Sequence, residues 1–220
     1  MYRVKEVFQT LQGEGAQAGR VAVFCRFSKC NLWTGREADR ERAVCRFCDT
    51  DFVGTDGQNG GKFETAEALA QHVASFWPGD LRSPECPLVV CTGGEPLLQL
   101  DVPLIEAFHG LGFAVAVETN GTLRPPEGID WLCVSPKAGT TIVIEACDEL
   151  KLVFPQDGHD PDDYDWMSAS ERFIAPMASA NVSGDRDLFR EASTRKAIEY
   201  CLAHPRWRLS VQMHKMVGID

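Results

Sequence analysis

Cys30, Cys45 and Cys48 are the residues with the clearest chemical potential in this chain of 220 residues. They lie in the segment CNLWTGREADRERAVCRFCDT with the spacing C-x14-C-x2-C, directly after a predicted strand, Val21–Phe27. Thiolates are the usual ligands of iron–sulfur clusters, and four of them close a cubane. Three leave one iron open to bind another molecule. The grouping therefore predicts a [4Fe-4S] cluster with an open coordination position, which indicates an enzyme.

A zinc site is the alternative use of the same cysteines. Structural zinc normally recruits a fourth Cys or His at short spacing. The nearest downstream histidine is His72, which falls inside a predicted helix. A zinc-binding interaction module predicts a colourless protein with one zinc, whereas the cluster predicts a brown protein.

The segment CTGGEPLL, which follows another predicted strand, is the second candidate site. Gly93 and Gly94 allow backbone to approach a ligand closely and leave peptide groups exposed to it. Glu95 offers a carboxylate that accepts hydrogen bonds from an ammonium group, and Pro96 suits the first turn of a following helix. Such a turn is also a common strand-to-helix connection, so alone it identifies no ligand.

The elements that must position these residues alternate between apolar strands and helical patterns. The predicted strands are Val21–Phe27, 88–91, 114–118, Trp131–Val134, 150–154, 172–175 and 209–212, and the predicted helices are 65–77, 101–111 and 185–203. This alternation is typical of a parallel α/β sheet with covered faces. Seven strands with few helices predict an incomplete barrel, with ligands bound at the carboxyl ends of the strands.

The insert between Cys30 and Cys45 is itself helix-like. Thr34 followed by Glu37 fits a capping box. We interpret the insert as a solvated charged helix that folds out and returns, bringing Cys45 and Cys48 back beside Cys30.

Composition sets the broad class of the protein. With 44% hydrophobic and 25% charged residues, the chain fits one domain, 1–220, with a cluster loop over 30–48 and a tail over 210–220 that closes the site. A net charge of -10 argues against a nucleic-acid partner. The sequence shows no signal region and no long apolar run, so we expect a cytoplasmic protein away from membranes, with its nine cysteines reduced.

The three cysteines and the GGEP turn together resemble the radical S-adenosylmethionine (SAM) enzymes, although those usually have the spacing CxxxCxxC. A narrower resemblance spans nearly the whole length. The segments FQTLQGEGAQAGRVAVFCRFSKCNLW, VETNGT, SPK, KLVFP and SVQMHKMVGID are similar to the 7-carboxy-7-deazaguanine synthase family of queuosine biosynthesis. The resemblance implies a partial (βα)6 barrel of the radical SAM type.

The family resemblance also implies an activity. Its members are carbon–nitrogen lyases that convert 6-carboxy-5,6,7,8-tetrahydropterin to 7-carboxy-7-deazaguanine and release ammonia. A 5′-deoxyadenosyl radical abstracts hydrogen from the pterin, which then undergoes ring contraction. The implied cofactors are a [4Fe-4S] cluster, SAM and Mg²⁺, and the implied partners are a flavodoxin-like or other reductant and a second copy in a homodimer.

Site residues follow from the same resemblance. Thr50 matches the magnesium ligand, and Cys30, Cys45 and Cys48 match the cluster ligands. The implied substrate contacts are Leu11, Gln12, Gly13, Glu14, Arg26, Thr92 and Asp220. The implied SAM contacts are Gly93, Gly94, Glu95, Glu118, Asn120, Ser135, Pro136 and Lys137.

Several of these assignments have simpler interpretations. Arg26 fits a surface charge as well as a bidentate partner of a substrate carboxylate. Thr50 alone resembles an ordinary turn residue, and Asp220 a frayed terminus. The segment APMA at 175–178 departs from the Gln-Pro pair of relatives and puts a SAM contact there in doubt. The sequence leaves the roles of His214 and Lys215 open. A glycyl-radical activase-like enzyme, which acts on a protein substrate, is the other enzymatic alternative.

Overall fold

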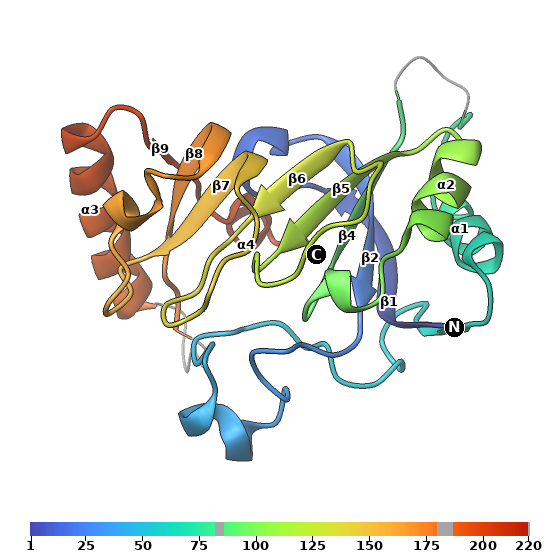
Figure 1. Cartoon of the computed structure of the whole chain (residues 1–220), viewed down its shortest axis with the longest axis horizontal. Helices are drawn as coiled ribbons and strands as arrows, with labels where there is room; N and C mark the ends of the chain where they lie inside the picture. Colours follow the sequence, from blue (N-terminus) through green and yellow to red (C-terminus); the bar gives the residue numbers. More distant parts are fainter. Residues whose placement is uncertain (82–85, 180–186, 220) are drawn as a thin grey trace.

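The computed structural model describes residues 1–81, 86–179 and 187–219, in which nine strands form a single sheet (Figure 1). The strands are β1 (Tyr2–Leu11), β2 (Val21–Phe27), β3 (Gly61–Phe63), β4 (Leu88–Gly93), β5 (Ala114–Thr119), β6 (Trp131–Val134), β7 (Ala146–Phe154), β8 (Ser168–Pro176) and β9 (Arg208–Leu209). The α-helices are α1 (Ala66–Ala74), α2 (Val102–Gly110), α3 (Leu188–Ala203) and α4 (Met213–Val217). Short 3-10 turns cover Gly15–Gln17, Glu37–Arg42, Pro96–Leu98 and Pro161–Tyr164.

The strand order is β3-β1-β2-β4-β5-β6-β7-β8-β9. β1 pairs antiparallel with β2 and with β3, and every other neighbouring pair is parallel. The parallel run from β2 to β9 stays open, because its β2 end continues into the antiparallel β1–β3 ribbon and its other end stops at the short β9. The predicted α/β class and partial barrel are confirmed.

Helices cover one face of this sheet, with α1 and α2 over its β1–β5 end and α3 beside β7 and β8 (Figure 1). Successive side chains of a strand point to opposite faces. On β4, Val89 and Cys91 join the core under α1 and α2, whereas Leu88 and Val90 join a cluster on the other face. The face of the sheet opposite the helices is called the inner face. Polar residues that alternate with core residues along the same strands lie on it.

Capping residues fix the starts of the two helices that build the main core. Thr65 accepts a hydrogen bond from the Ala68 amide at the start of α1, and Asp101 accepts one from Leu104 at the start of α2. After α2 the chain turns at Gly112, whose φ of +91° is the left-handed conformation that ends a helix. No helix in the described ranges combines the length and apolarity that a membrane span needs.

All seven predicted strands and three predicted helices are present, with shifted ends. The last predicted strand, 209–212, is wrong beyond Leu209, where β9 ends. The Ser210 side chain accepts a hydrogen bond from the Gly15 amide at 2.9 Å. Strands β1 and β3 and helix α4 were not predicted from the sequence. Helix α3 begins at Leu188 rather than at the predicted position 185, and residues 185–186 lie outside the described residues.

The predicted capping box in the insert is also wrong. The 3-10 turn Glu37–Arg42 starts after Arg36, which makes no side-chain cap. The Thr34 hydroxyl instead donates to Asp39 at 2.8 Å and accepts from the Arg36 amide. Because the segment has to return to the site within a few residues, it forms a short turn rather than a regular α-helix.

Replacing Phe108 by Ala tests the main core. Phe108 of α2 is fully buried and packs edge-on against Phe113, with ring centroids 6.3 Å apart. We expect the free energy of unfolding to fall by about 3–5 kcal/mol in chemical denaturation. Leu202→Ala on α3 is the matched control, because Leu202 is 79% exposed and should cost less than about 0.5 kcal/mol. Equal losses in the two variants would contradict this account of the core.

Candidate functional site

Two cavities, of about 220 and about 410 Å³, lie at the carboxyl ends of the parallel strands. They adjoin each other, because six residues line both of them. These shared residues are Glu14, Asp49, Thr50, Glu118, Lys151 and Gln212. The smaller is called the cysteine cavity below and the larger the polar cavity.

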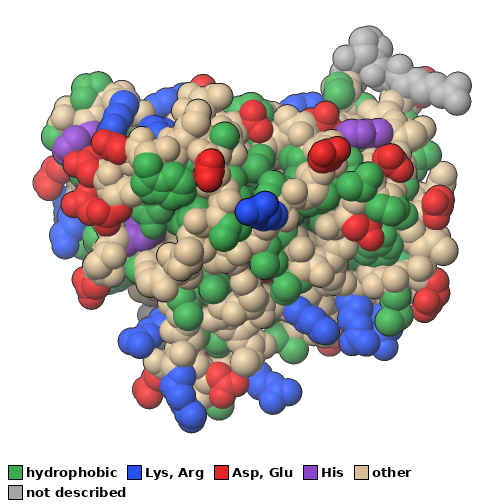
Figure 2. Space-filling model, in the orientation of Figure 1, with side chains coloured by type: hydrophobic (Ala, Val, Ile, Leu, Met, Phe, Trp, Pro, Cys, Tyr) green, Lys and Arg blue, Asp and Glu red, His purple; other side chains and the backbone are tan. Residues whose placement is uncertain are grey.

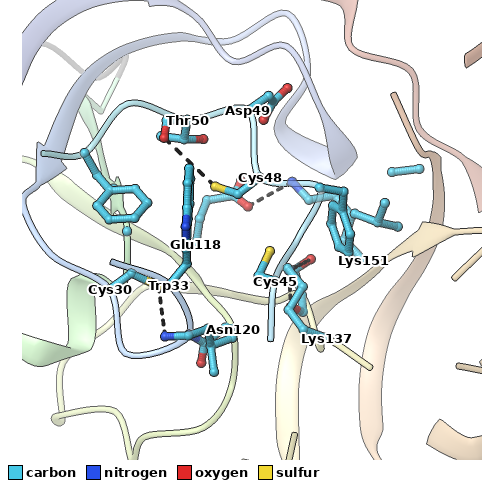
Figure 3. A pocket seen from close by; sticks show the side chains of 18 of the residues that line it. Cys30, Trp33, Cys45, Cys48, Asp49, Thr50, Glu118, Asn120, Lys137 and Lys151 are labelled. Carbon is cyan, nitrogen blue, oxygen red and sulfur yellow. Dashed lines mark hydrogen bonds and ion pairs between the residues drawn. The ribbon is translucent and has the colours of Figure 1, made fainter. Parts of the chain in front are cut away.

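The cysteine cavity brings Cys30, Cys45 and Cys48 together although 14 residues separate the first two (Figure 3). Cys30 follows β2, and the other two stand at the end of the insert, which projects below the sheet in Figure 1. Figure 2 shows Lys and Arg side chains together with Asp and Glu on this projection. Among the described residues no three His, Cys, Asp or Glu side chains are grouped as ligands of one metal ion. Thiolates of a cubane each bind a different iron.

Arg40 holds the insert in its returning path. Its guanidinium donates to the carbonyl oxygens of Arg46 at 2.7 Å and Cys48 at 2.9 Å, and it pairs with Glu37. It also covers the ring of Trp33, with 4.2 Å between the guanidinium carbon and the ring centroid. The charged insert is therefore ordered around one buried stack and two backbone contacts, which place the last two cysteines.

The thiols of Cys45 and Cys48 interact directly. Their hydrogen bond lowers the pKa of Cys48 and raises that of Cys45, while burial raises both. Lys137, which lines the same cavity, acts to lower the pKa of each thiol. A nearby ammonium thus favours the thiolate form that binds metal.

The turn at residues 93–95 packs against the backbone before Cys30. The Glu95 amide donates to the Lys29 carbonyl at 2.9 Å. A Cβ at Gly94 would lie 2.1 Å from the Lys29 carbonyl oxygen and 2.8 Å from Cys30 Cβ, so only glycine fits here. Gly93 has a φ of +135° and lies equally close to Phe27.

Glu95 is fully buried and its carboxylate is already bonded by the protein. It accepts from the Leu97 amide at 3.0 Å, the Thr119 hydroxyl at 2.7 Å and the Asn120 amide at 2.8 Å. Burial raises the pKa of Glu95, and these donors oppose that effect. Glu95 therefore joins the glycine turn to the end of β5.

Inner-face residues of four strands line the polar cavity. Arg26 of β2, Thr92 of β4, Glu118 of β5 and Lys151 of β7 each alternate with core residues of their strand. The Nε of Arg26 donates to Glu6 at 2.7 Å, and its guanidinium carbon lies 5.9 Å from the Phe8 ring centroid. Arg26 is therefore a held, partly buried cation rather than a free surface charge.

The C-terminal segment covers this cavity. Met213 donates through its amide to the Gly13 carbonyl at 2.9 Å, and Gln212 donates to Glu14 at 3.0 Å. His214 lies so close to Gly13 that a Cβ there would be 2.1 Å from its Nδ1. Lys215 pairs with Asp49 beside the cysteine loop. His214 and Lys215, whose roles the sequence left open, thus line the polar cavity.

The structure groups most of the residues that the sequence singled out. Those lining the cysteine cavity are Cys30, Cys45, Cys48, Thr50, Gly93, Gly94, Glu118, Asn120, Ser135 and Lys137. Those lining the polar cavity are Leu11, Gln12, Gly13, Glu14, Arg26, Thr50, Thr92 and Glu118. Glu95 and Pro136 are buried behind the lining, and Asp220 lies outside the described residues. Ala175, Pro176 and Ala178 also line the cysteine cavity.

Sequence analysis missed Lys151 and Gln212. A charged residue between Leu150 and Leu152 of a buried strand was the available signal for Lys151, because alternation places it on the face opposite the core. Gln212 carried no signal, since its place depends on how the C-terminal segment docks.

Comparison with known proteins identifies the family. Over 218 residues the chain is 56% identical to the 7-carboxy-7-deazaguanine synthase of Caulobacter vibrioides, with 99% of both chains covered. It is 57% identical over 218 residues to the synthase of Bordetella pertussis, again with 99% of both covered. The chain belongs to the 7-carboxy-7-deazaguanine synthase family. The family resemblance expected from the sequence is confirmed.

A solved structure extends the comparison to the fold. The crystal structure of QueE from Escherichia coli is similar with a TM-score of 0.67 at 25% identity, over 97% of this chain and 94% of that one. No family model matches the chain. Full-length membership in the synthase family favours the predicted synthase over the activase-like enzyme and over the zinc-binding module.

Arg40→Ala tests how the insert places the cysteines. The variant removes the donors to the Arg46 and Cys48 carbonyls and uncovers Trp33, so we expect cluster affinity to fall by about 10–100-fold. Iron and sulfide content after anaerobic reconstitution measures the loss. Arg42→Ala, at an exposed position of the same turn, should reconstitute like the unchanged protein. Equal iron content in the two variants would show that Arg40 does not order the loop.

Gly94→Ala tests the close approach of the glycine turn to Cys30. The added methyl must displace the Lys29–Cys30 backbone, so we expect a lower melting temperature and weaker SAM binding by the reconstituted protein. Gly110→Ala is the matched control, since a Cβ there meets nothing within 4 Å and should stabilise α2 by up to about 1 kcal/mol. Calorimetry of unfolding and of SAM binding separates the two effects. Unchanged SAM affinity in Gly94→Ala would remove this turn from the binding site.

Proposed function

We propose that this protein is a radical SAM lyase that converts 6-carboxy-5,6,7,8-tetrahydropterin to 7-carboxy-7-deazaguanine with loss of ammonia. The observation that carries the proposal is that the two cavities adjoin, so that the cavity lined by three cysteines lies beside a polar one. Ammonia and the deazaguanine together contain the atoms of the pterin, so the reaction consumes no net oxidant. The relatives' printed name supports the product.

The donor set of the cysteine cavity fits a [4Fe-4S] cluster and SAM. Cys30, Cys45 and Cys48 would hold the cluster, and Gly93 and Gly94 offer backbone to the methionine end of SAM. Further SAM contacts are proposed for Glu95, Glu118, Asn120, Ser135, Pro136 and Lys137. When bound, these groups supply the radical that abstracts hydrogen from the substrate.

Lys137 lines the cysteine cavity and is positioned to assist binding of the cluster and SAM. Its ammonium donates to the Ser135 hydroxyl at 2.8 Å, and burial lowers its pKa while the neighbouring Cys45 thiol opposes that change. The backbone at 175–178, although it lacks the usual polar side chain, still lines the cavity through Ala175, Pro176 and Ala178. We propose that this segment contacts SAM through backbone atoms.

Thr50 lines both cavities and is proposed as the Mg²⁺ ligand. Magnesium takes oxygen donors and keeps several waters, so a single protein hydroxyl supplemented by substrate oxygens is sufficient. Thr50 would hold such an ion at the boundary of the two cavities, where the ion would supply positive charge for the substrate carboxylate.

The polar cavity offers partners for each part of the pterin. Arg26 would bind the substrate carboxylate through its two terminal nitrogens, because its Nε already donates to Glu6. Leu11, Gln12, Gly13, Glu14 and Thr92 would contact the ring, and Asp220 would close the site. A low-potential reductant such as a flavodoxin, a homodimeric assembly and action in the cytoplasm complete the proposal.

The decisive experiment supplies the anaerobically reconstituted, reduced protein with SAM and the carboxytetrahydropterin. We expect 7-carboxy-7-deazaguanine and ammonia, detected by mass spectrometry and an ammonia assay, in excess over the SAM consumed. Deoxyadenosine without deazaguanine would retain the radical SAM site and refute the substrate. Loss of both products would refute the cluster assignment itself.

Cys45→Ala tests the ligand assignment directly, because it leaves the cubane with only two of its three thiolate ligands. We expect loss of the brown colour and of turnover. Cys201→Ala, a cysteine on α3 away from both cavities, is the control that should keep both. Full turnover by Cys45→Ala would contradict the ligand assignment.

A further inference from the structure

Lys151 is a buried cation at the junction of the two cavities, where the sequence predicted no function. Its side chain is only 7% exposed. Nζ lies 3.0 Å from Oε2 of Glu14 and 2.8 Å from Oε2 of Glu118. Figure 3 shows Lys151 and Glu118 at this junction. One ammonium therefore bridges two of the three carboxylates that line both cavities, the third being that of Asp49.

The remaining carboxylate oxygens are also held. Oε1 of Glu118 accepts from the Gln12 side chain at 3.2 Å, and Oε1 of Glu14 accepts from Gln212 at 3.0 Å. The network joins β1, β5, β7 and the C-terminal segment. Each carboxylate keeps lone pairs for further hydrogen bonds, since a carboxylate has about four acceptor sites.

Charge balance explains why the buried carboxylate of Glu14 stays ionised. Burial acts to raise the pKa of Glu14, but Lys151, Gln212 and His214 lower it to about 2. Burial acts to lower the pKa of Lys151, but Cys133, Glu118, Glu14 and Glu149 raise it well above its ordinary value.

Other titratable groups face this network and contribute to its charge balance. Glu149 of β7 accepts a hydrogen bond from the Ala16 amide at 3.0 Å, and burial raises its pKa. Cys133 of β6 is buried, which raises its pKa well above the ordinary value. Lys137 and His214 approach from the other sides, and burial lowers the pKa of both. Lys151 is thus the main cation that offsets the inner-face carboxylates.

We propose that Lys151 is a positioning residue that keeps Glu14 and Glu118 ionised and correctly oriented, so that together they accept hydrogen bonds from the N–H edge of the substrate. The proposal rests on the proposed function. It makes the pair selective for a reduced heterocycle rich in N–H donors, because two ionised carboxylates present acceptors only. A substrate analogue that presents hydrogen-bond acceptors along this edge would leave the two buried carboxylates without donors. The site would therefore reject it.

Removing the ammonium has a consequence of definite sign. Without Lys151, burial and mutual repulsion raise the pKa of one carboxylate, so that it takes up a proton that the unchanged protein does not hold. A protonated carboxyl turns one acceptor into a donor and repels a substrate N–H. Raising the pH removes that proton and restores the acceptor.

The experiment compares Lys151→Met and Lys151→Arg with the unchanged enzyme and with Lys196→Met, an exposed position on α3. The ratio kcat/KM for the pterin is followed from about pH 6 to about pH 9. We expect Lys151→Met to lose at least about tenfold near pH 7 and to recover as the pH rises. Lys151→Arg, which retains the charge, should keep the pH profile of the unchanged enzyme, and Lys196→Met should match it in full.

A second variant and a spectroscopic readout separate positioning from simple loss of structure. Lys151→Met combined with Glu118→Gln removes one cation and one anion, so its profile should lose the new ionisation. Infrared difference spectra of the proteins without substrate should show a protonated carboxyl band for Lys151→Met at neutral pH that the double variant lacks.

The outcomes are distinguishable from failure of the proposed function. If the unchanged enzyme makes no deazaguanine, that function fails, while the carboxyl band still tests the charge coupling. A Lys151→Met profile parallel to that of the unchanged enzyme, or no protonated carboxyl in its spectrum, would overturn the inference. A Lys151→Arg profile shifted as far as that of Lys151→Met would do the same.

Discussion

The buried carboxylate of Glu95 is the interaction on which the geometry of the site depends. It joins the end of β4 to the end of β5 through three protein donors, and its own amide bonds the backbone just before Cys30. Burying a carboxylate is costly unless it is hydrogen-bonded, so the arrangement is stable only with all donors in place. The glycine turn, the first cysteine and Asn120 are therefore positioned together as one rigid unit.

Around that unit, the parallel sheet separates packing from chemistry. Alternate residues of β2, β4, β5 and β7 enter the core under the helices, and the residues between them point to the inner face, where polar ones near the carboxyl ends line the cavities. The cost is a set of buried charges on the inner face. Lys151 offsets much of that charge by pairing with Glu14 and Glu118, and Glu149 is satisfied by the backbone of Ala16. Stability and function thus share the same polar residues.

The long cysteine spacing is accommodated without changing the site. Arg40, stacked on Trp33 and bonded to two carbonyl oxygens, makes the insert fold back on itself. Trp33 in turn packs edge-on against Phe52, with centroids 5.7 Å apart. Convergence of thiols in space is what a cluster requires, and a small aromatic cluster with one arginine achieves it here.

Local patterns in the sequence determined much of the protein. Apolar runs marked seven strands, helical patterns between them marked α1, α2 and α3, and the cysteines and GGEP segment marked the site, because each depends on neighbouring residues along the chain. Tertiary structure decided the rest. The polar strand β1 and the short α4 are ordered by their partners, and Lys151 gains its meaning only from Glu14 and Glu118, which lie 137 and 33 positions away in the chain. Electrostatic pairing between strands depends on distance in space, which no local pattern records.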